Sequence, residues 1–297
     1  MMINSGRRGW SGRLLRIPVL ILAFTMVVPY YWMLTGAFKS VPELLKNPPT
    51  FYVARPTLNN FYDPLGNRPP DHIEGLFQRL TGAPLRFGTY YLNSLFISTT
   101  ITILSLILAS AAAYVLAKHR FPGRDLFFLF FVASMMVPWQ VTIIPNFLTM
   151  KYLGWINTYW ALLVPALPKA FVVFFLRQYM LSLPDELLDA ARIDGAGEVR
   201  IWWQIVLPLV GPALTAMSIF VVLNEWNNFV WPLIIVQDAA HGTLPLALSQ
   251  LSSTLSGPTT MGVMMAAALL VSLPTLLMFT LFQRQFIRGI ALSGLKG

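Results

Sequence analysis

The sequence predicts an all-α membrane protein with six transmembrane helices. Of its 297 residues, 56% are hydrophobic and only 11% are charged, whereas soluble domains carry about 25% charged residues. The apolar residues gather in runs of about 20, which is long enough for a helix to cross a bilayer. Cysteine is absent, which excludes disulfides and cysteine–metal sites. The formal net charge is +9, and the basic residues lie beside the apolar runs. They form no cluster interleaved with aromatic residues, so no nucleic-acid partner is expected.

The first apolar run, residues 17–38, follows an arginine-rich N-terminus. It is longer than the apolar region of a signal peptide, about 7–15 residues, so it predicts a helix that is retained. The expected later spans are residues 91–117, 125–150, 158–180, 208–235 and 261–282. The terminal segments outside these spans are 1–16 and 284–297. Between the spans lie a long loop, 39–90, and a polar loop, 181–207. The loop 39–90 is rich in proline and aromatic residues, and two roles remain open for it, a functional cover or a passive linker.

The distribution of basic residues predicts the orientation of these spans. With both termini in the cytoplasm, most Lys and Arg residues face the cytoplasm, including those of the short turn 118–124 and of loop 181–207. The long loop 39–90 is then extracytoplasmic. We therefore expect a multi-pass protein of the bacterial cytoplasmic (inner) membrane.

The polar loop begins with a short amphipathic helix. Pro184 and the carboxylates of Asp185 and Glu186 suit a first helical turn, where no N–H partner is needed and the helix dipole favours negative charge. One narrow face carries Leu187, Ala190, Ala191 and Asp194. Gly195 is placed to end the helix in a left-handed conformation. Because the side chains in the middle of this face are small, the backbone of another protein could approach it closely. The helix therefore resembles a docking element.

Two ionisable residues lie inside predicted spans, Lys169 in the fourth and Glu225 in the fifth. Charges within the membrane usually face the bundle interior with a partner or a water path. Two interpretations remain open: the two residues pair as packing contacts, or they line a solute path. The residues around Glu225 suit hydroxyl-bearing solutes as well as interhelical hydrogen bonds, because amides both donate and accept. These neighbours are Asn224, Trp226, Asn227 and Asn228.

Motifs of catalysis are missing from the sequence. There is no G-x-x-x-x-G-K-[ST] phosphate loop, no H-E-x-x-H and no G-x-S-x-G. The three histidines lie far apart in predicted loops and indicate no metal site. We expect neither catalytic residues nor metal ligands in this chain.

The polar loop resembles the "EAA" loop of ABC importer permeases. The shared pattern is Asp189-Ala190-Ala191, two residues, Asp194-Gly195, nine residues and Ile205-x-Leu207-Pro208, with Asp189 where the family has glutamate. The resemblance covers the chain from about Asn93 to the end. It is nearest to the second, six-span permease of carbohydrate importers of the maltose and glycerol-phosphate type. Further matching segments are 120–124, Trp226 to Phe229, Thr243-Leu244-Pro245 and Gly294 to Gly297.

The resemblance implies a type I ABC importer permease fold, with a permease domain over residues 17–283 and a cytoplasmic coupling helix. The residues it assigns to ATPase coupling are Glu186, Asp189, Ala190, Ala191, Asp194, Gly195 and Pro208. The implied partners are a paralogous permease in a heterodimer, two ATP-binding subunits that hold ATP and Mg, and an extracytoplasmic solute-binding protein. The implied function is import of a sugar, oligosaccharide or sugar-derived solute, driven by the partners' ATP hydrolysis. An ion-coupled secondary transporter that acts without an ATPase is the alternative.

Overall fold

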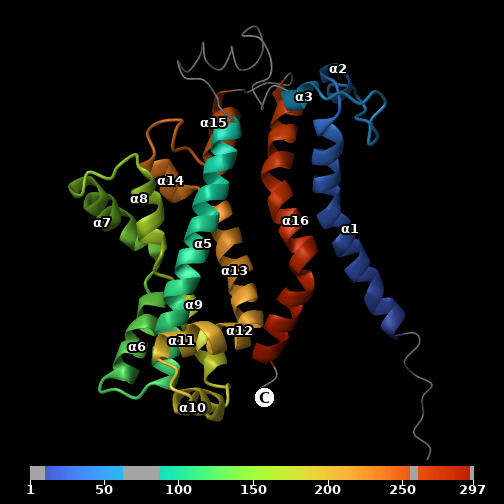
Figure 1. Ribbon diagram of the computed structural model, residues 1–297. Coiled ribbons are helices and arrows are strands. Elements are labelled where there is room, and N and C mark those ends of the chain that lie inside the picture. Colours follow the sequence, from blue (N-terminus) through green and yellow to red (C-terminus); the bar gives the residue numbers. More distant parts are fainter. Residues whose placement is uncertain (1–10, 63–86, 255–259, 295–297) are drawn as a thin grey trace, which may run out of the picture. The chain divides into compact units, whose positions relative to one another are not determined.

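The computed structural model describes residues 11–62, 87–254 and 260–294. Within these residues the regular structure is entirely helical (Figure 1). The chain divides into two compact units: residues 1–86 with 248–273, and residues 87–247 with 274–297. We call them unit 1 and unit 2; helices α15 (Leu244–Thr254) and α16 (Met261–Gly294) each contribute to both.

Among the described residues, four helices are long and apolar enough to span a membrane: Ile17–Ala37, Phe87–Lys118, Tyr159–Met180 and Met261–Leu281. Two further spans arise if each of two bent helix pairs is counted as one. The first pair, 124–152, falls on the predicted third span, whereas the second, 198–226, begins inside the predicted polar loop and overlaps the predicted fifth span only over residues 208–226. The third is not one straight helix, because α6 (Arg124–Met135) and α7 (Trp139–Tyr152) meet at 99°. Pro138 stands at this break and cannot donate a helical hydrogen bond.

Unit 1 contains α1 (Ser11–Ala37), α2 (Val41–Leu44), α3 (Asn59–Tyr62) and the first part of α16. The side-chain amide of Asn60 is buried and donates to the carbonyls of Ala37 (2.9 Å) and Lys39 (2.8 Å), which lie at the end of α1 and just beyond it. These bonds satisfy carbonyls that the helix leaves without partners. Lys39 is also buried, and it bonds the carbonyl of Thr50. The first part of the predicted loop 39–90 is therefore folded against α1, whereas residues 63–86 lie outside the described residues.

Unit 2 is built around α5 (Phe87–Lys118), which packs against α9 (Ala170–Met180) and α13 (Gly211–Trp226) (Figure 1). Its 32 residues extend about 48 Å. The buried face of α5 is lined by small and polar side chains, which let neighbouring backbones approach closely; it includes Ser98, Thr102, Ser105, Ala109 and Ala113. Thr102 Oγ1 donates to the carbonyl of Ser98 at 2.6 Å, so this hydroxyl is satisfied within the helix.

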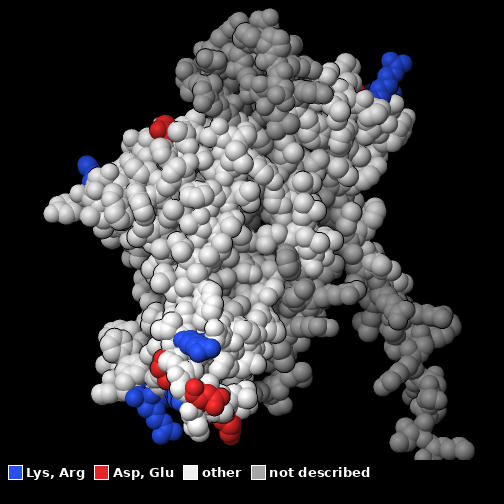
Figure 2. Space-filling model, viewed as in Figure 1, with Lys and Arg blue, Asp and Glu red and all other residues white. Residues whose placement is uncertain are grey.

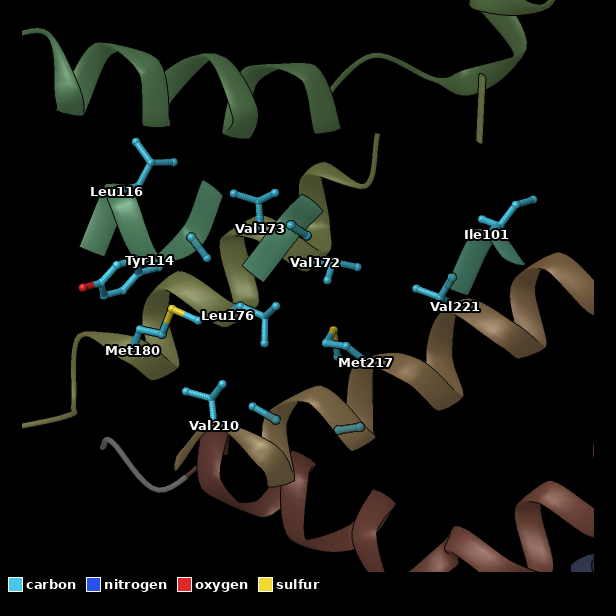
Figure 3. Packing of buried hydrophobic residues seen from close by; sticks show 14 of the residues in the cluster. Ile101, Tyr114, Leu116, Val172, Val173, Leu176, Met180, Val210, Met217 and Val221 are labelled. Atoms are coloured by element: carbon cyan, nitrogen blue, oxygen red, sulfur yellow. The ribbon is translucent and has the colours of Figure 1, made fainter. Parts of the chain in front are cut away.

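The apolar core of unit 2 lies between α5, α9 and α13. Figure 3 shows Val172 and Leu176 of α9 close to Met217 and Val221 of α13, with Ile101 of α5 beside them. All five side chains are buried. This packing fixes the three helices that carry the site residues.

The remaining helices of unit 2 are short. They are α8 (Tyr159–Leu163), a 3₁₀ turn (Val164–Ala166), α10 (Asp185–Ile193), α11 (Glu198–Ile201), a π-helical turn (Trp202–Val206), α12 (Leu207–Leu209) and α14 (Val230–Ile235). The predicted tail 284–297 is helical as far as Gly294, because α16 continues through it. Of the predicted N-terminal segment 1–16, residues 11–16 already belong to α1, and residues 1–10 lie outside the described part.

Candidate functional site

The predicted docking helix is α10. Pro184 precedes it as the N-cap residue, and Asp185 and Glu186 occupy its first turn. Gly195 has φ +82°, and the next residue's N–H, that of Ala196, donates to the carbonyl of Ala191 at 2.9 Å. This is the bond pattern of a left-handed helix end, which glycine adopts without a steric penalty. The prediction that Gly195 ends the helix is confirmed.

The small face expected on α10 divides between two environments. Leu188 and Ala191 are buried in the core of unit 2. The exposed residues of the helix and its end are Asp185, Glu186, Leu187, Asp189, Ala190, Ile193, Asp194 and Gly195. Ala191 therefore packs the helix against the rest of its own chain, whereas Ala190 is the small residue that a partner could contact.

Exposed apolar side chains continue beyond α10. Ile193 is 87% exposed, Val199 is 76% exposed and Trp203 is 55% exposed. Figure 2 shows charged residues gathered at the end of unit 2 that holds α10 and α11, beside a broad face without charge. Large apolar side chains displayed among charges mark an interaction surface.

Two sets of polar contacts tie this loop to the end of α5. Lys118 Nζ lies 2.6 Å from Asp185 Oδ1 and donates to the Leu183 carbonyl at 2.6 Å. Tyr114 Oη donates to Glu198 Oε2 at 2.6 Å, and Arg192 Nε donates to Glu198 Oε1 at 2.9 Å. The start and the middle of the loop are thus anchored to one long helix.

The same contacts set the charges of the loop. The hydrogen bond from Lys118, together with its charge, holds the pKa of Asp185 below its usual value. The hydrogen bond from Arg192 lowers the pKa of Glu198, and it raises the pKa of the Arg192 guanidinium. Near neutral pH the carboxylates of Asp185 and Glu198 are therefore charged. Neither Glu198 nor Tyr114 was predicted as a site residue, because only the fold brings them together.

Pro208 directly follows the polar loop 181–207, which we call the docking loop. It lies in α12, and its side chain is exposed. It follows the π-helical turn Trp202–Val206. Proline lacks an N–H, and its ring would clash with the carbonyl four residues earlier in a regular α-helix. The widened turn relieves that clash, and the chain then bends by 81° into α13.

A cavity of about 780 Å³ opens in unit 2 where three predicted spans are interrupted. Its wall comes from α7, from the break between the 3₁₀ turn and α9, and from the stretch joining α13 to α14. The lining residues are Trp139, Thr142, Ile143, Asn146, Pro165, Ala166, Lys169, Phe220, Leu223, Asn224, Glu225, Asn227, Asn228, Phe229, Val230 and Trp231. Interrupted helices around a cavity that contains polar side chains are typical of solute sites in transporters.

Lys169 and Glu225 meet in this wall. Lys169 Nζ lies 2.6 Å from Glu225 Oε1, and Asn228 Nδ2 donates to Glu225 Oε2 at 3.4 Å. The Glu225 side chain is only 3% exposed, whereas that of Lys169 is 23% exposed. The two residues form an ion pair, as the first interpretation predicts, and both line the cavity. Their place in a solute path stays a prediction.

The two tryptophans near the break have different places. Trp226 is buried and does not belong to the cavity lining; its ring packs edge-on against Tyr91 with centroids 5.5 Å apart. Trp231 lines the cavity, and its indole N–H donates to the Ala161 carbonyl at 2.8 Å. Trp231 thus fixes α14 to α8.

A polar cluster holds the connection from α14 to α15. Asn93 Nδ2 donates to the carbonyls of Ala240 (2.8 Å) and Gly242 (2.9 Å), and Tyr159 Oη donates to Asn93 Oδ1 at 2.7 Å. Asn157 Nδ2 donates to Asp238 Oδ2 at 2.8 Å. These bonds fix the connection that follows α14 to α5, at the end of α5 opposite the docking loop.

Comparisons with known proteins place these features in a family. Residues 101–291 match the family described as "Binding-protein-dependent transport system inner membrane component". The chain is 37% identical to the arabinooligosaccharides transport system permease protein AraQ of Halalkalibacterium halodurans, over 96% of each chain. It is 37% identical to the sn-glycerol-3-phosphate transport system permease protein UgpE of Yersinia pestis bv. Antiqua, over 69% of this chain and 73% of the relative.

A solved structure shares the fold. A chain from a bacterial ABC transporter involved in the import of the acidic polysaccharide alginate aligns with a TM-score of 0.82, over 96% of this chain and 100% of that chain, at 21% identity. The family match covers the docking loop, Lys169 and the Asn-rich stretch around Glu225. The chain therefore belongs to the family of binding-protein-dependent transport system inner membrane components.

Proposed function

We propose that this chain is a transmembrane subunit of an ATP-driven, binding-protein-dependent importer of a sugar, oligosaccharide or sugar-derived solute. The observation that carries the proposal is the exposed surface of α10 and α11, which is anchored to a membrane-spanning helix through charged contacts. The import of arabinooligosaccharides and sn-glycerol-3-phosphate by relatives supports the solute class.

The proposed assembly is a heterodimer of this chain with a paralogous permease, two ATP-binding subunits and an extracytoplasmic solute-binding protein. ATP and Mg belong to the ATP-binding subunits, and this chain performs no bond chemistry. The assembly lies in the cytoplasmic membrane. The basic residues of the turn between α5 and α6 and of the docking loop support a cytoplasmic placement of that end and of both termini.

The anchors of the docking loop suggest how motion is transmitted. Closure of the ATP-binding subunits displaces α10, and the Lys118–Asp185 and Tyr114–Glu198 contacts pass the displacement to α5. Helices α9 and α13 pack on α5 and carry Lys169 and Glu225 at or near their ends. A shift of α5 therefore changes the geometry of the cavity wall and exposes it alternately to the two sides.

Site-directed cross-linking tests the docking surface. Because the chain has no native cysteine, Ile193→Cys supplies a single attachment point for a thiol-reactive benzophenone. In the reconstituted complex we expect this probe to cross-link to the ATP-binding subunit upon illumination, since Ile193 is 87% exposed on the proposed contact.

Tyr152→Cys is the matched control, since Tyr152 is 91% exposed at the end of α7 and lies outside the docking loop. It should give no product with the ATP-binding subunit. Equal cross-linking from both positions, or none from position 193 in a complex that imports solute, would refute the docking assignment.

A further inference from the structure

We propose that the cavity in unit 2 binds an uncharged, polyhydroxylated solute such as a neutral oligosaccharide, and excludes acidic ones. The inference rests on the proposed function and narrows its solute class. Three properties of the wall carry it: the balance of charge, the supply of hydrogen-bonding groups and the exposed aromatic rings.

The charges in the described lining cancel. Lys169 and Glu225 are the only ionisable residues in that part of the wall, and they pair at 2.6 Å. Both carboxylate oxygens of Glu225 are engaged, one by Lys169 and the other by Asn228. The wall therefore presents no net charge to a solute.

The burial of Glu225 makes this balance hard to disturb. An anionic solute that took Lys169 as its partner would leave the Glu225 carboxylate unpaired, with a side chain only 3% exposed. An uncompensated buried charge is strongly unfavourable. A cationic solute gains little from Glu225, because this side chain is only 3% exposed and already pairs with Lys169.

The remaining polar groups suit hydroxyls. Side-chain amides of Asn146, Asn224, Asn227 and Asn228 and the hydroxyl of Thr142 line the cavity. Each amide offers both donors and an acceptor, as a sugar hydroxyl requires. Lys169 has three N–H donors and Glu225 accepts one of them, so the ammonium can also donate to a hydroxyl or ring oxygen.

Exposed rings supply the apolar complement. Trp139 is 51% exposed and Phe220 is 43% exposed, and both line the cavity with Trp231. The C–H face of a sugar ring packs against such surfaces, while its hydroxyls reach the amides. The volume of about 780 Å³ lies within the range of small-ligand sites, about 300–1,000 Å³. The wall thus combines a few polar groups with apolar area and carries no net charge.

Direct binding to the assembled complex in nanodiscs, without the solute-binding protein, tests the inference. The probes are radiolabelled neutral trisaccharides (arabinotriose, maltotriose, cellotriose) and trigalacturonate, which has the same length and carries carboxylates. We expect at least one neutral trisaccharide to bind about tenfold or more tightly than trigalacturonate, a difference of about 1.4 kcal/mol. Tighter binding of trigalacturonate, or no binding of any neutral probe, would overturn the inference.

A variant that removes the negative charge of Glu225 makes the test specific to the ion pair. Glu225→Gln keeps the shape and an oxygen acceptor for Lys169 but removes the negative charge. We expect its affinity for trigalacturonate to rise by about tenfold or more. Lys169→Met combined with Glu225→Gln should restore exclusion, and an unchanged preference in Glu225→Gln would contradict the inference.

A second variant covers the case in which Glu225→Gln does not fold. Asn224 is exposed and lines the cavity, so Asn224→Lys adds a cation to the wall without disturbing the pair, and it should likewise admit trigalacturonate. The cross-linking of Ile193→Cys to the ATP-binding subunit does not depend on any of these affinities. A permease that cross-links but prefers the acidic probe would keep the proposed function and lose only the neutral solute class.

Discussion

Gly195→Trp is expected to abolish ATP hydrolysis stimulated by the solute-binding protein, together with solute uptake, while the permease remains folded. Gly195 has φ +82° and an added Cβ meets no atom within 4 Å, so the indole projects from the end of α10 toward the proposed partner. A non-glycine residue in this conformation costs about 1–2 kcal/mol, which is less than the stability of a typical domain, about 5–15 kcal/mol. The loss would therefore arise from blocked docking and not from unfolding.

Gly154→Trp is the matched control for this variant. Gly154 has φ +69°, and its added Cβ also meets no atom within 4 Å, but it lies in the turn after α7, away from the docking loop. It therefore imposes similar backbone strain without touching the proposed interface. ATP hydrolysis stimulated by the solute-binding protein is measured for both variants in liposomes. Equal stimulated hydrolysis in the two variants would show that Gly195 is not at the coupling contact.

Breaking the Lys169–Glu225 pair is expected to give the largest loss of stability. Glu225→Leu removes the acceptor and leaves Lys169 without its 2.6 Å partner. Removing one member of a buried pair costs about 3–5 kcal/mol, and we expect the lower end, since Lys169 retains access to water in the cavity. The apparent melting temperature should fall by roughly 10 °C, as measured by thermal unfolding of the purified complex.

The double variant Lys169→Leu with Glu225→Leu separates the pair from the packing around it. Because it leaves no unpaired charge, it should regain most of the stability lost in Glu225→Leu. A double variant as unstable as the sum of the two single variants would show that the residues do not interact. Glu225→Leu as stable as the parent would show that the pair contributes nothing to the fold.

The docking loop could be predicted in detail because its signals are local. A proline with carboxylates at one end, a glycine at the other and an apolar spacing between them depend only on neighbouring residues. The helix Asp185–Ile193 and the left-handed Gly195 follow from these alone. The division of its small face was not predictable, since Ala191 is buried by contacts with distant helices of the core.

The anchors of the loop depend on tertiary structure. Tyr114 and Glu198 are 84 residues apart, and Lys118 and Asp185 are 67 apart. No periodicity brings such residues together, although a carboxylate early in a short helix and a basic residue at the end of a long one are both common. Their pairing became visible only when α5 and the docking loop were placed side by side.

The cavity was partly predictable. An ionisable residue inside an apolar run indicates a polar environment in the bundle, and this directed attention to Lys169, Glu225 and the asparagines. The sequence could not decide between pairing and lining, and it did not indicate that Trp226 packs on Tyr91 outside the cavity wall. The sequence also did not indicate that residues of α7 line the cavity. The chain bends by 99° at Pro138, and its direction after the bend depends on tertiary packing.

Solute uptake by the reconstituted complex tests the central claim most directly. The chain and the proposed partners, a paralogous permease and the ATP-binding subunits, are placed in liposomes with ATP inside and solute-loaded binding protein outside. We predict uptake that requires both ATP and the binding protein and that persists when ionophores collapse every ion gradient. Uptake that proceeds without ATP and stops with the ionophores would contradict the account and identify an ion-coupled transporter.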